Sequence, residues 1–197
     1  MEFLKQNEGQ AWILFKNGDN KMFTAIYSAY SQKLYQYGLK FTQNRSIIED
    51  SIQDLFLDLW KNRRTIGLTD NILRYLFKSF RHKLVRRLQQ EKRYDLNNDP
   101  EAFSFDVTYS FEQVLILREI AEREMKIFRT VLDGLTPRQK EAIYLKFTNG
   151  LSYEEVSGIM EMSLEACRNL VYRAVKGLRE AITAGTGPDY PEKRHQR

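Results

Sequence analysis

Apolar residues recur every three or four positions through most of this chain, and that spacing constrains the fold class more than any other feature. Such a repeat places apolar side chains on one face of an α-helix, whereas a half-buried strand alternates at every second position. Strand-like alternation is nearly absent. The spacing predicts helices at residues 20–42 (broken near Tyr30), 46–62, 71–90, 112–133, 137–147, 152–160 and 163–182. The predicted fold class is therefore all-α.

Three capping boxes mark predicted helix starts, at Ser46–Glu49, Thr136–Gln139 and Ser152–Glu155. In such a box the hydroxyl accepts from an amide of the first turn, and the third residue's side chain reaches back to the amide of the capping residue. Pro137 follows Thr136 at the first helical position, where its missing N–H removes no hydrogen bond.

The predicted helix 71–90 is both apolar and basic. One face carries an apolar stripe of Leu73, Leu76, Phe77, Phe80, Leu84 and Leu88. From Ile72 to Arg93 the chain has eight Lys/Arg and a single acid, Glu91. A solvated face usually interleaves acids for pairing at i, i+4. Their absence favours nucleic-acid contact, with these candidate residues on the outer face: Tyr75, Lys78, His82 and Arg86.

The predicted helix 46–62 has an acidic outer face. Its candidate partner-binding residues are Asp50, Gln53, Asp54 and Leu57, with Trp60 nearby. A solvated face is one alternative. A metal site is another, made of Glu49, Asp50, Asp54 and Asp58, and it would suit a metal-dependent nuclease. A metal site usually takes ligands from several elements, and no acids or histidines elsewhere in the sequence form a pattern that would complete this one. We therefore expect no metal, no cofactor and no catalytic residue.

The last third of the chain predicts a helix-turn-helix, because two short capped helices are joined by a tight turn and the second is basic. Its inner stripe is Cys167, Val171, Ala174, Val175 and Leu178. The outward residues are of the types that read base edges and phosphates: Glu165, Arg168, Asn169, Tyr172, Arg173 and Lys176. A plain three-helix bundle is the alternative.

Charge and composition narrow the class of protein further. From Tyr94 to Val114 there is no Lys or Arg but five acids. An acidic connector therefore separates two basic surfaces, and this arrangement suits a protein that binds a polyanion at two places.

No apolar run approaches the ~20 residues of a membrane helix. One cysteine and two histidines exclude an intrachain disulfide and argue against structural zinc. With no signal-peptide pattern at the N-terminus, we expect a cytoplasmic protein without membrane insertion.

These motifs together resemble an extracytoplasmic-function (ECF) sigma factor of RNA polymerase. Asp50-Ser-Ile-Gln53-Asp54-Leu-Phe56 matches the D-x-x-Q-[DE]-x-F core of sigma region 2. YLFKSFRHKLVRRL stands where the family has the helix that meets the melted minus-ten element, and LSYEEVSGIMEMSLEACRNLVYRAVKGLR matches region 4. The resemblance spans roughly Met22 to Ile182. His82 and Arg86 stand where the family often has Asn and Asp, and Glu161 stands at the usual turn glycine.

The resemblance implies two helical domains joined by an acidic linker. The expected divisions are region 2 at 1–93, the linker at 94–111, region 4 with its helix-turn-helix at 112–182, and a disordered tail at 183–197. It implies that the Asp50 face binds core RNA polymerase, that the Tyr75 face meets the minus-ten DNA, and that the Arg168 face reads the minus-thirty-five element. The loop Asn62–Asn71 would hold an unstacked base, and an anti-sigma factor would be a further partner.

A free-standing helix-turn-helix regulator is the alternative function. Such a regulator usually needs a dimer to match two half-sites of DNA. It would also leave the motif Asp50–Phe56 without a role.

Overall fold

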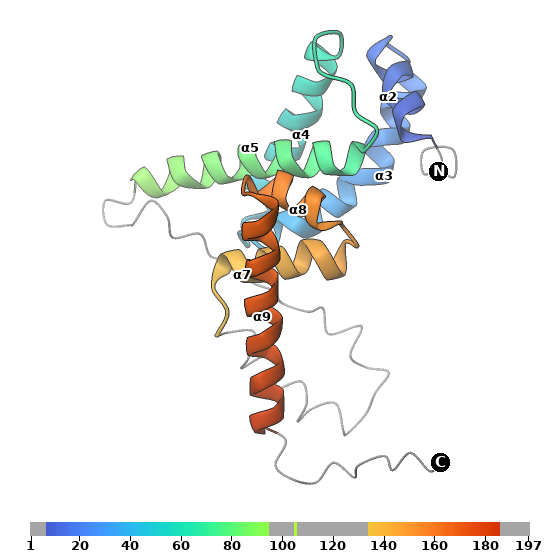
Figure 1. Cartoon of the computed structure of the whole chain (residues 1–197). Coiled ribbons are helices and arrows are strands. Elements are labelled where there is room, and N and C mark those ends of the chain that lie inside the picture. Colours follow the sequence, from blue (N-terminus) through green and yellow to red (C-terminus); the bar gives the residue numbers. More distant parts are fainter. Residues whose placement is uncertain (1–6, 95–104, 106–133, 186–197) are drawn as a thin grey trace, which may run out of the picture.

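The computed structural model describes residues 7–94, residue 105 and residues 134–185, and every regular element in those ranges is helical. An N-terminal unit contains α2 (Glu8–Lys16), α3 (Asn20–Gly38), α4 (Arg45–Asn62) and α5 (Ile72–Tyr94). A C-terminal unit contains α7 (Pro137–Ile143), the π-helical turn η2 (Tyr144–Thr148), α8 (Tyr153–Met160) and α9 (Leu164–Gly185) (Figure 1). The predicted all-α fold class is confirmed. In the described ranges no helix combines the length and apolar character that a bilayer span requires.

Some predictions fall outside the described residues. These are the helix at 112–133, the linker apart from Tyr94 and Phe105, and the tail beyond Gly185. The start of that tail differs from the prediction, because α9 continues as helix to Gly185.

Local capping chemistry explains where the helices begin. The capping boxes at Thr136 and Ser152 are both complete, and Pro137 occupies the first turn of α7. The prediction for Ser46 is wrong: α4 begins at Arg45, and the Asn44 side chain caps it by accepting from the Ile47 amide at 3.4 Å. Asparagine at the N-cap satisfies a free amide as serine would.

The predicted break of α3 near Tyr30 is also wrong, because α3 is continuous. Tyr30 is buried, and its hydroxyl donates to Glu8 Oε1 at 2.7 Å, so its polar atom is satisfied without a bend. At the other end of α3, a Cβ on Gly38 would lie 2.7 Å from Ile48 Cγ2. Glycine therefore allows the end of α3 to lie directly against α4 and α5.

The predicted apolar stripes form the interior of both units. In α5, Leu76, Phe77, Phe80 and Leu84 are fully buried. In α9 the predicted inner residues Cys167, Val171 and Ala174 are buried as well. Each fully buried large aliphatic or aromatic side chain contributes about 1.5–3 kcal/mol of transfer free energy. Both helices thus bury one face and keep the other for solvent or partners.

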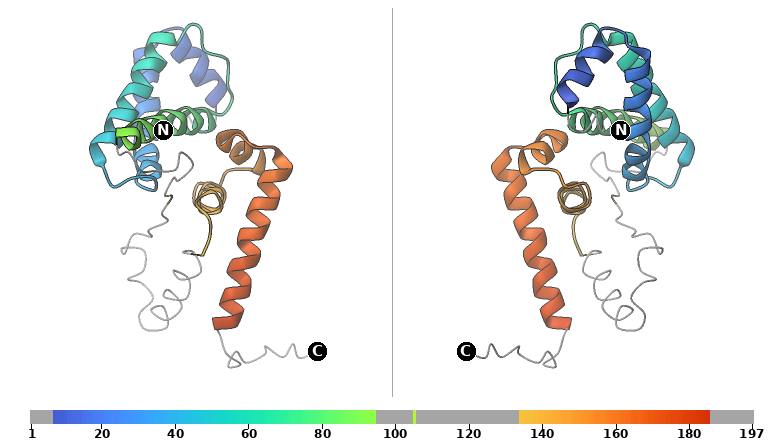
Figure 2. Two further views of the ribbon diagram at one scale, coloured as in Figure 1. Left: turned by 90° about the vertical axis from the view of Figure 1, so that its left-hand side faces the viewer. Right: turned by 90° about the vertical axis from the view of Figure 1, so that its right-hand side faces the viewer.

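The two units pack against each other, with α8 lying across α5 and α9 running away from the N-terminal unit (Figure 2). A carboxylate from α7, Glu141, is buried between them. Arg81 of α5 donates to both of its oxygens, Nε to Oε1 at 2.7 Å and Nη2 to Oε2 at 3.2 Å. The Tyr37 hydroxyl of α3 donates to the same carboxylate. Burial and the Glu141 charge raise the pKa of Tyr37, which therefore remains a protonated donor.

We expect Arg81→Met to separate the two units without unfolding either. An unpaired buried carboxylate costs about 3–5 kcal/mol, and separation lets water solvate Glu141. Small-angle X-ray scattering should show a larger radius of gyration while circular dichroism keeps its helical signal.

Lys83→Met is the matched control. Lys83 pairs with Asp58 inside the N-terminal unit, with side chains 31% and 52% exposed, and exposed pairs contribute at most about 1 kcal/mol. It should leave the radius unchanged. An Arg81→Met protein as compact and stable as wild type would mean that the Glu141 pair does not hold the units together.

Candidate functional site

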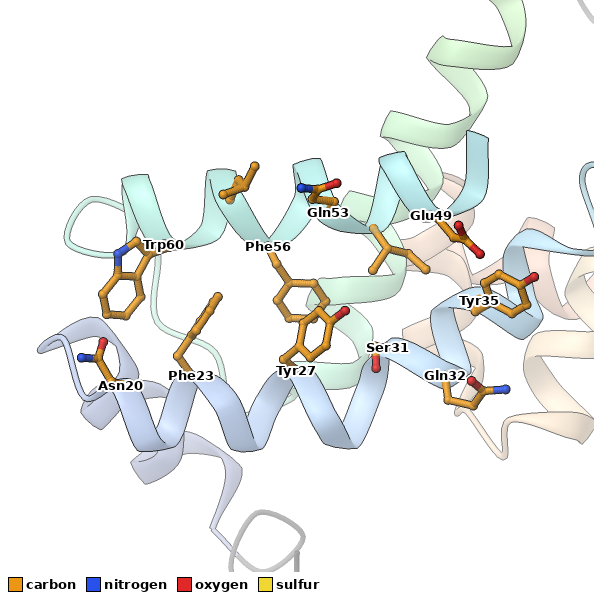
Figure 3. Close-up of a pocket in the computed structure, with 12 residues that line it drawn as sticks. Asn20, Phe23, Tyr27, Ser31, Gln32, Tyr35, Glu49, Gln53, Phe56 and Trp60 are labelled. Carbon is orange, nitrogen blue, oxygen red and sulfur yellow. The ribbon is translucent and has the colours of Figure 1, made fainter. Parts of the chain in front are cut away.

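The α4 outer face consists of Asp50, Gln53, Asp54 and Leu57, all of which are exposed. It borders a groove of about 750 Å³ between α3 and α4. Figure 3 shows Phe23 and Tyr27 of α3 facing Phe56 and Trp60 of α4 along this groove. Sequence reasoning found the α4 outer face and Trp60 but missed the groove, since two helices build it. The four-residue spacing of Phe23 and Tyr27 was its only local signal.

Three acids of α4 face basic side chains of α5 rather than one another: Asp50, Asp54 and Asp58. Asp54 lies 2.8 Å from Arg87 Nη2, and Asp58 lies 2.5 Å from Lys83 Nζ. Among the described residues no group of three His, Cys, Asp or Glu could hold a metal ion. This pairing argues against the alternative of a metal site on α4.

The α5 outer face consists of Tyr75, Lys78, His82 and Arg86. Lys78, His82 and Arg86 are exposed, at intervals of about one helical turn. Tyr75 is half-buried, and its ring packs on Trp12 with centroids 4.9 Å apart. Between this face and the loop that joins α4 to α5 (residues 63–71) lies a pocket of about 490 Å³, whose lining includes Leu68, Tyr75, Lys78 and His82.

Glu161, in the turn after α8, contacts the α5 outer face directly. Its carboxylate lies 2.8 Å from His82 Nε2 and 3.5 Å from Lys78 Nζ. The hydrogen bond with His82, together with the charges of His82 and Lys78, lowers the pKa of Glu161 below 4.5. It is therefore ionised at neutral pH. Its backbone is left-handed, with φ 54°, so a turn position that favours glycine carries a charged side chain instead.

Two further contacts join α8 to the region around the pocket. Asn71, at the end of the loop, donates through its side-chain amide to Glu155 Oε1. Gly158 lies so close to Arg74 that an added Cβ would stand 3.2 Å from its Nε. The C-terminal unit therefore covers part of the α5 outer face.

The α9 outer face remains open. Its six predicted residues are all exposed: Glu165, Arg168, Asn169, Tyr172, Arg173 and Lys176. Tyr172 is 66% exposed, and the Arg168 side chain lies 3.6 Å from Glu154 of α8. The Ser163 hydroxyl accepts from the Ala166 amide and so caps the start of the helix. Cys167 points inward, and burial raises the pKa of its thiol.

Two family models match this chain. The Sigma-70 region 2 model matches residues 26–94, and the Sigma-70, region 4 model matches residues 125–178. Region 2 thus covers most of the N-terminal unit, with the α4 and α5 outer faces, and region 4 covers α7, α8 and most of α9. Together the two matches span more than half of the chain.

Curated relatives match this chain over most of their length. The ECF RNA polymerase sigma factor SigK of Mycobacterium ulcerans (strain Agy99) is 25% identical over 175 residues, which cover 85% of this chain and 89% of the relative. The ECF RNA polymerase sigma factor SigW of Bacillus subtilis (strain 168) is 21% identical over 173 residues, covering 85% and 92%.

Two solved structures share the fold. The sigma factor RpoE in complex with the anti-sigma factor NepR from Bartonella quintana has a TM-score of 0.61 at 22% identity, covering 83% of this chain and 98% of that chain. CnrH in complex with the cytosolic domain of CnrY has a TM-score of 0.58 at 17% identity, covering 90% and 98%.

Both sigma regions therefore occur in order on one chain, and the residues of the three outer faces fall within the matched ranges. The resemblance drawn from the sequence motifs is confirmed, and the chain belongs to the sigma-70 family as an ECF sigma factor of RNA polymerase.

Proposed function

We propose that this sigma factor works through three separate surfaces and has no catalytic activity of its own. The α4 outer face binds core RNA polymerase, the α5 outer face and its pocket meet the minus-ten DNA, and the α9 outer face reads the minus-thirty-five element. The observation that carries this proposal is the exposure of the α4 and α9 outer faces on separate units. The domain division follows the same plan, with region 2 at 1–93, a linker at 94–111, region 4 at 112–182 and a tail at 183–197.

The α9 outer face has the chemistry for duplex recognition. Arginine donates two hydrogen bonds to guanine, and asparagine can pair with adenine in the same bidentate way. Arg168 and Asn169 lie near the start of α9, as base-reading residues do in other recognition helices. Arg173 and Lys176 lie farther along the helix, where cations meet phosphates.

The α5 outer face has the chemistry for an opened strand. Lys78, His82 and Arg86 can follow a phosphate backbone, while Tyr75 at the pocket offers a ring for stacking. Because Glu161 already contacts Lys78 and His82, DNA must displace it. Minus-ten binding therefore requires α8 to move away from α5.

An anti-sigma factor is a further proposed partner, since the structurally similar RpoE was solved with the anti-sigma factor NepR. The groove between α3 and α4 is an apolar surface suited to a protein partner. We place the protein in the cytoplasm, where core polymerase and promoter DNA meet. A free-standing regulator is less well supported, because it gives the α4 outer face no role.

Transcription tests this function. The purified chain, added to core RNA polymerase and a pool of genomic fragments, should start transcripts from a defined subset of fragments. Binding to DNA without polymerase, together with no effect on initiation, would favour the free-standing regulator instead.

We expect Leu57→Ser to weaken binding to core polymerase by roughly tenfold, as loss of one apolar contact at an interface does. Leu57 is 47% exposed, so its removal should leave the fold stable. Ile13→Ser is the matched control, because Ile13 is also 47% exposed and lies on α2. Binding can be measured by fluorescence anisotropy of labelled protein. Equal losses for the two variants would reject the α4 outer face as the docking surface.

On α9, a contact to a base edge and a contact to a phosphate predict different outcomes of mutation. Asn169→Ala should reduce discrimination between upstream sequences by ~1–3 kcal/mol, whereas Arg173→Ala should weaken binding to all sequences alike. Both can be measured on fragments with single base-pair changes at several salt concentrations. Arg179→Ala removes the same charge from an exposed residue of α9 outside the proposed face and should have little effect. If neither Asn169→Ala nor Arg173→Ala changes binding, α9 is not the recognition helix.

We expect Glu161→Gln to increase the affinity of the free protein for a single-stranded minus-ten oligonucleotide roughly two- to fivefold, as expected when exposed ion pairs are lost. Glutamine keeps the left-handed backbone, so the substitution isolates the charge. Because the pKa of Glu161 is lowered, its contribution to the closed arrangement is present at neutral pH and is lost as the solution becomes more acidic than pH 4.5.

Glu91→Gln is the control for Glu161→Gln, since it removes one exposed acid from α5 itself. It should change the affinity much less. Equal gains for the two variants would show that only net charge matters and that Glu161 does not shield the α5 outer face.

A further inference from the structure

The helix α2 has no role in the three surfaces described above. It covers Glu8–Lys16 and precedes residue 26, where the region 2 match begins. Ala11, Trp12 and Phe15 bury its apolar side in the N-terminal unit. Glu8, Trp12 and Lys16 follow at four-residue intervals, so their side chains lie along one stripe of the helix.

Two residues of this stripe contact the segment between α4 and α5, and the third contacts the first residue of α5. The Trp12 indole donates from Nε1 to the Gly67 carbonyl at 2.9 Å, and Lys16 Nζ donates to the Ile66 carbonyl. Glu8 Oε2 accepts from the Ile72 amide, the first of α5, at 2.6 Å. The stripe therefore holds the middle of the loop and fixes where the next helix starts.

The loop's own hydrogen bonds lie near its two ends. Thr65 and Ile66 amides donate back to the Asn62 carbonyl, and Thr69 and Asn71 bond each other at the far end. The middle of the loop, at Gly67 and Leu68, is exposed, and an added Cβ on Gly67 would contact nothing. Contacts from α2 are therefore what restrains this middle part.

The restrained segment forms a wall of the pocket on the α5 outer face. Leu68, directly after Gly67, is 74% exposed and lines that pocket. Tyr75 lines it too, and its ring rests on the Trp12 ring. One buried tryptophan therefore positions both the loop and the stacking ring.

We infer that Glu8, Trp12 and Lys16 are positioning residues for promoter opening. They hold the loop and Tyr75 in the shape that receives an unstacked base, although they touch no DNA. The inference rests on the proposed role of the α5 outer face. Ordering a loop in advance removes an entropy loss that binding would otherwise incur. This saving in entropy affects only the step in which a base leaves the duplex and enters the pocket.

Trp12→Phe and Lys16→Met test the inference in the full chain bound to core polymerase. Phenylalanine keeps a ring on Tyr75 but removes the indole N–H, and methionine keeps the lysine stem but removes the donor. Each should slow open-complex formation roughly three- to tenfold, the worth of a hydrogen bond. The signal is 2-aminopurine fluorescence in the minus-ten element. Affinities for core polymerase and for the minus-thirty-five duplex should not change.

Two controls separate positioning from general destabilisation. Lys21→Met makes the same substitution on an exposed lysine of α3 and should open promoters normally. Phe15→Leu disturbs the buried side of α2, where the Phe15 ring packs on Trp12, Phe23 and Trp60, but it leaves both hydrogen bonds from α2 to the loop in place. If Phe15→Leu slows opening as much as Trp12→Phe at a similar melting temperature, α2 acts only through stability.

Hydrogen exchange of the free protein distinguishes failure of the positioning role from failure of the proposed function. Amides of residues 64–70 should exchange faster in Trp12→Phe and Lys16→Met than in wild type. Unchanged exchange overturns the positioning role, whatever the promoter data show. Wild-type protein that cannot open any promoter with core polymerase would instead overturn the proposed function.

Discussion

The arrangement of the two units depends on one buried carboxylate. A buried ionised acid is tolerated only when cations and donors surround it, and Glu141 is 4% exposed at its side chain. Its partners, Arg81 and Tyr37, both belong to the N-terminal unit. Burial lowers the pKa of Arg81, but the hydrogen bond and charge of Glu141 outweigh it and raise that pKa overall. Arg81 is thus fully charged.

Aromatic packing surrounds this ion pair and extends the contact. Tyr37 stacks on Phe77 inside the N-terminal unit and on Tyr144 of the C-terminal unit, with centroids 4.9 Å and 6.0 Å apart. Phe105, from the segment predicted as a linker, packs edge-on against Phe41 and is 3% exposed. Three separate parts of the sequence therefore meet around Tyr37. Apolar contacts at this point exclude water and strengthen the electrostatic interaction that they enclose.

The sequence predicted the helices well because their determinants are local. The Thr136 and Ser152 capping boxes and the α5 stripe each depend on residues within a few positions of one another. The inward and outward faces of α9 followed from the same spacing. One failure has a local cause, since Asn44 could cap α4 as well as Ser46. The other does not, because Tyr30 bonds Glu8 in a helix that was not predicted.

The candidate site was harder to predict because its contacts are distant in sequence. The basic residues of α5 seemed unpaired when only neighbours at i, i+4 were considered. Their acids come instead from α4, from α7 and from the turn after α8. The hydrogen bond from Trp12 to Gly67 leaves no pattern in a single segment, and the groove between α3 and α4 leaves only the spacing of Phe23 and Tyr27. Such contacts appear only once tertiary packing is known.

The sources of these acids decide which charges of α5 change when the units separate. Asp54 and Asp58 belong to the N-terminal unit, so Arg87 and Lys83 keep their partners. Glu141 and Glu161 leave with the C-terminal unit, and Arg81, Lys78 and His82 lose theirs. Separation therefore adds free positive charge at Lys78, which lines the pocket, and at Arg81 one turn farther along α5. Lys83 and Arg87 stay neutralised on the α4 side of the helix, so the new attraction for DNA is confined to the opposite side.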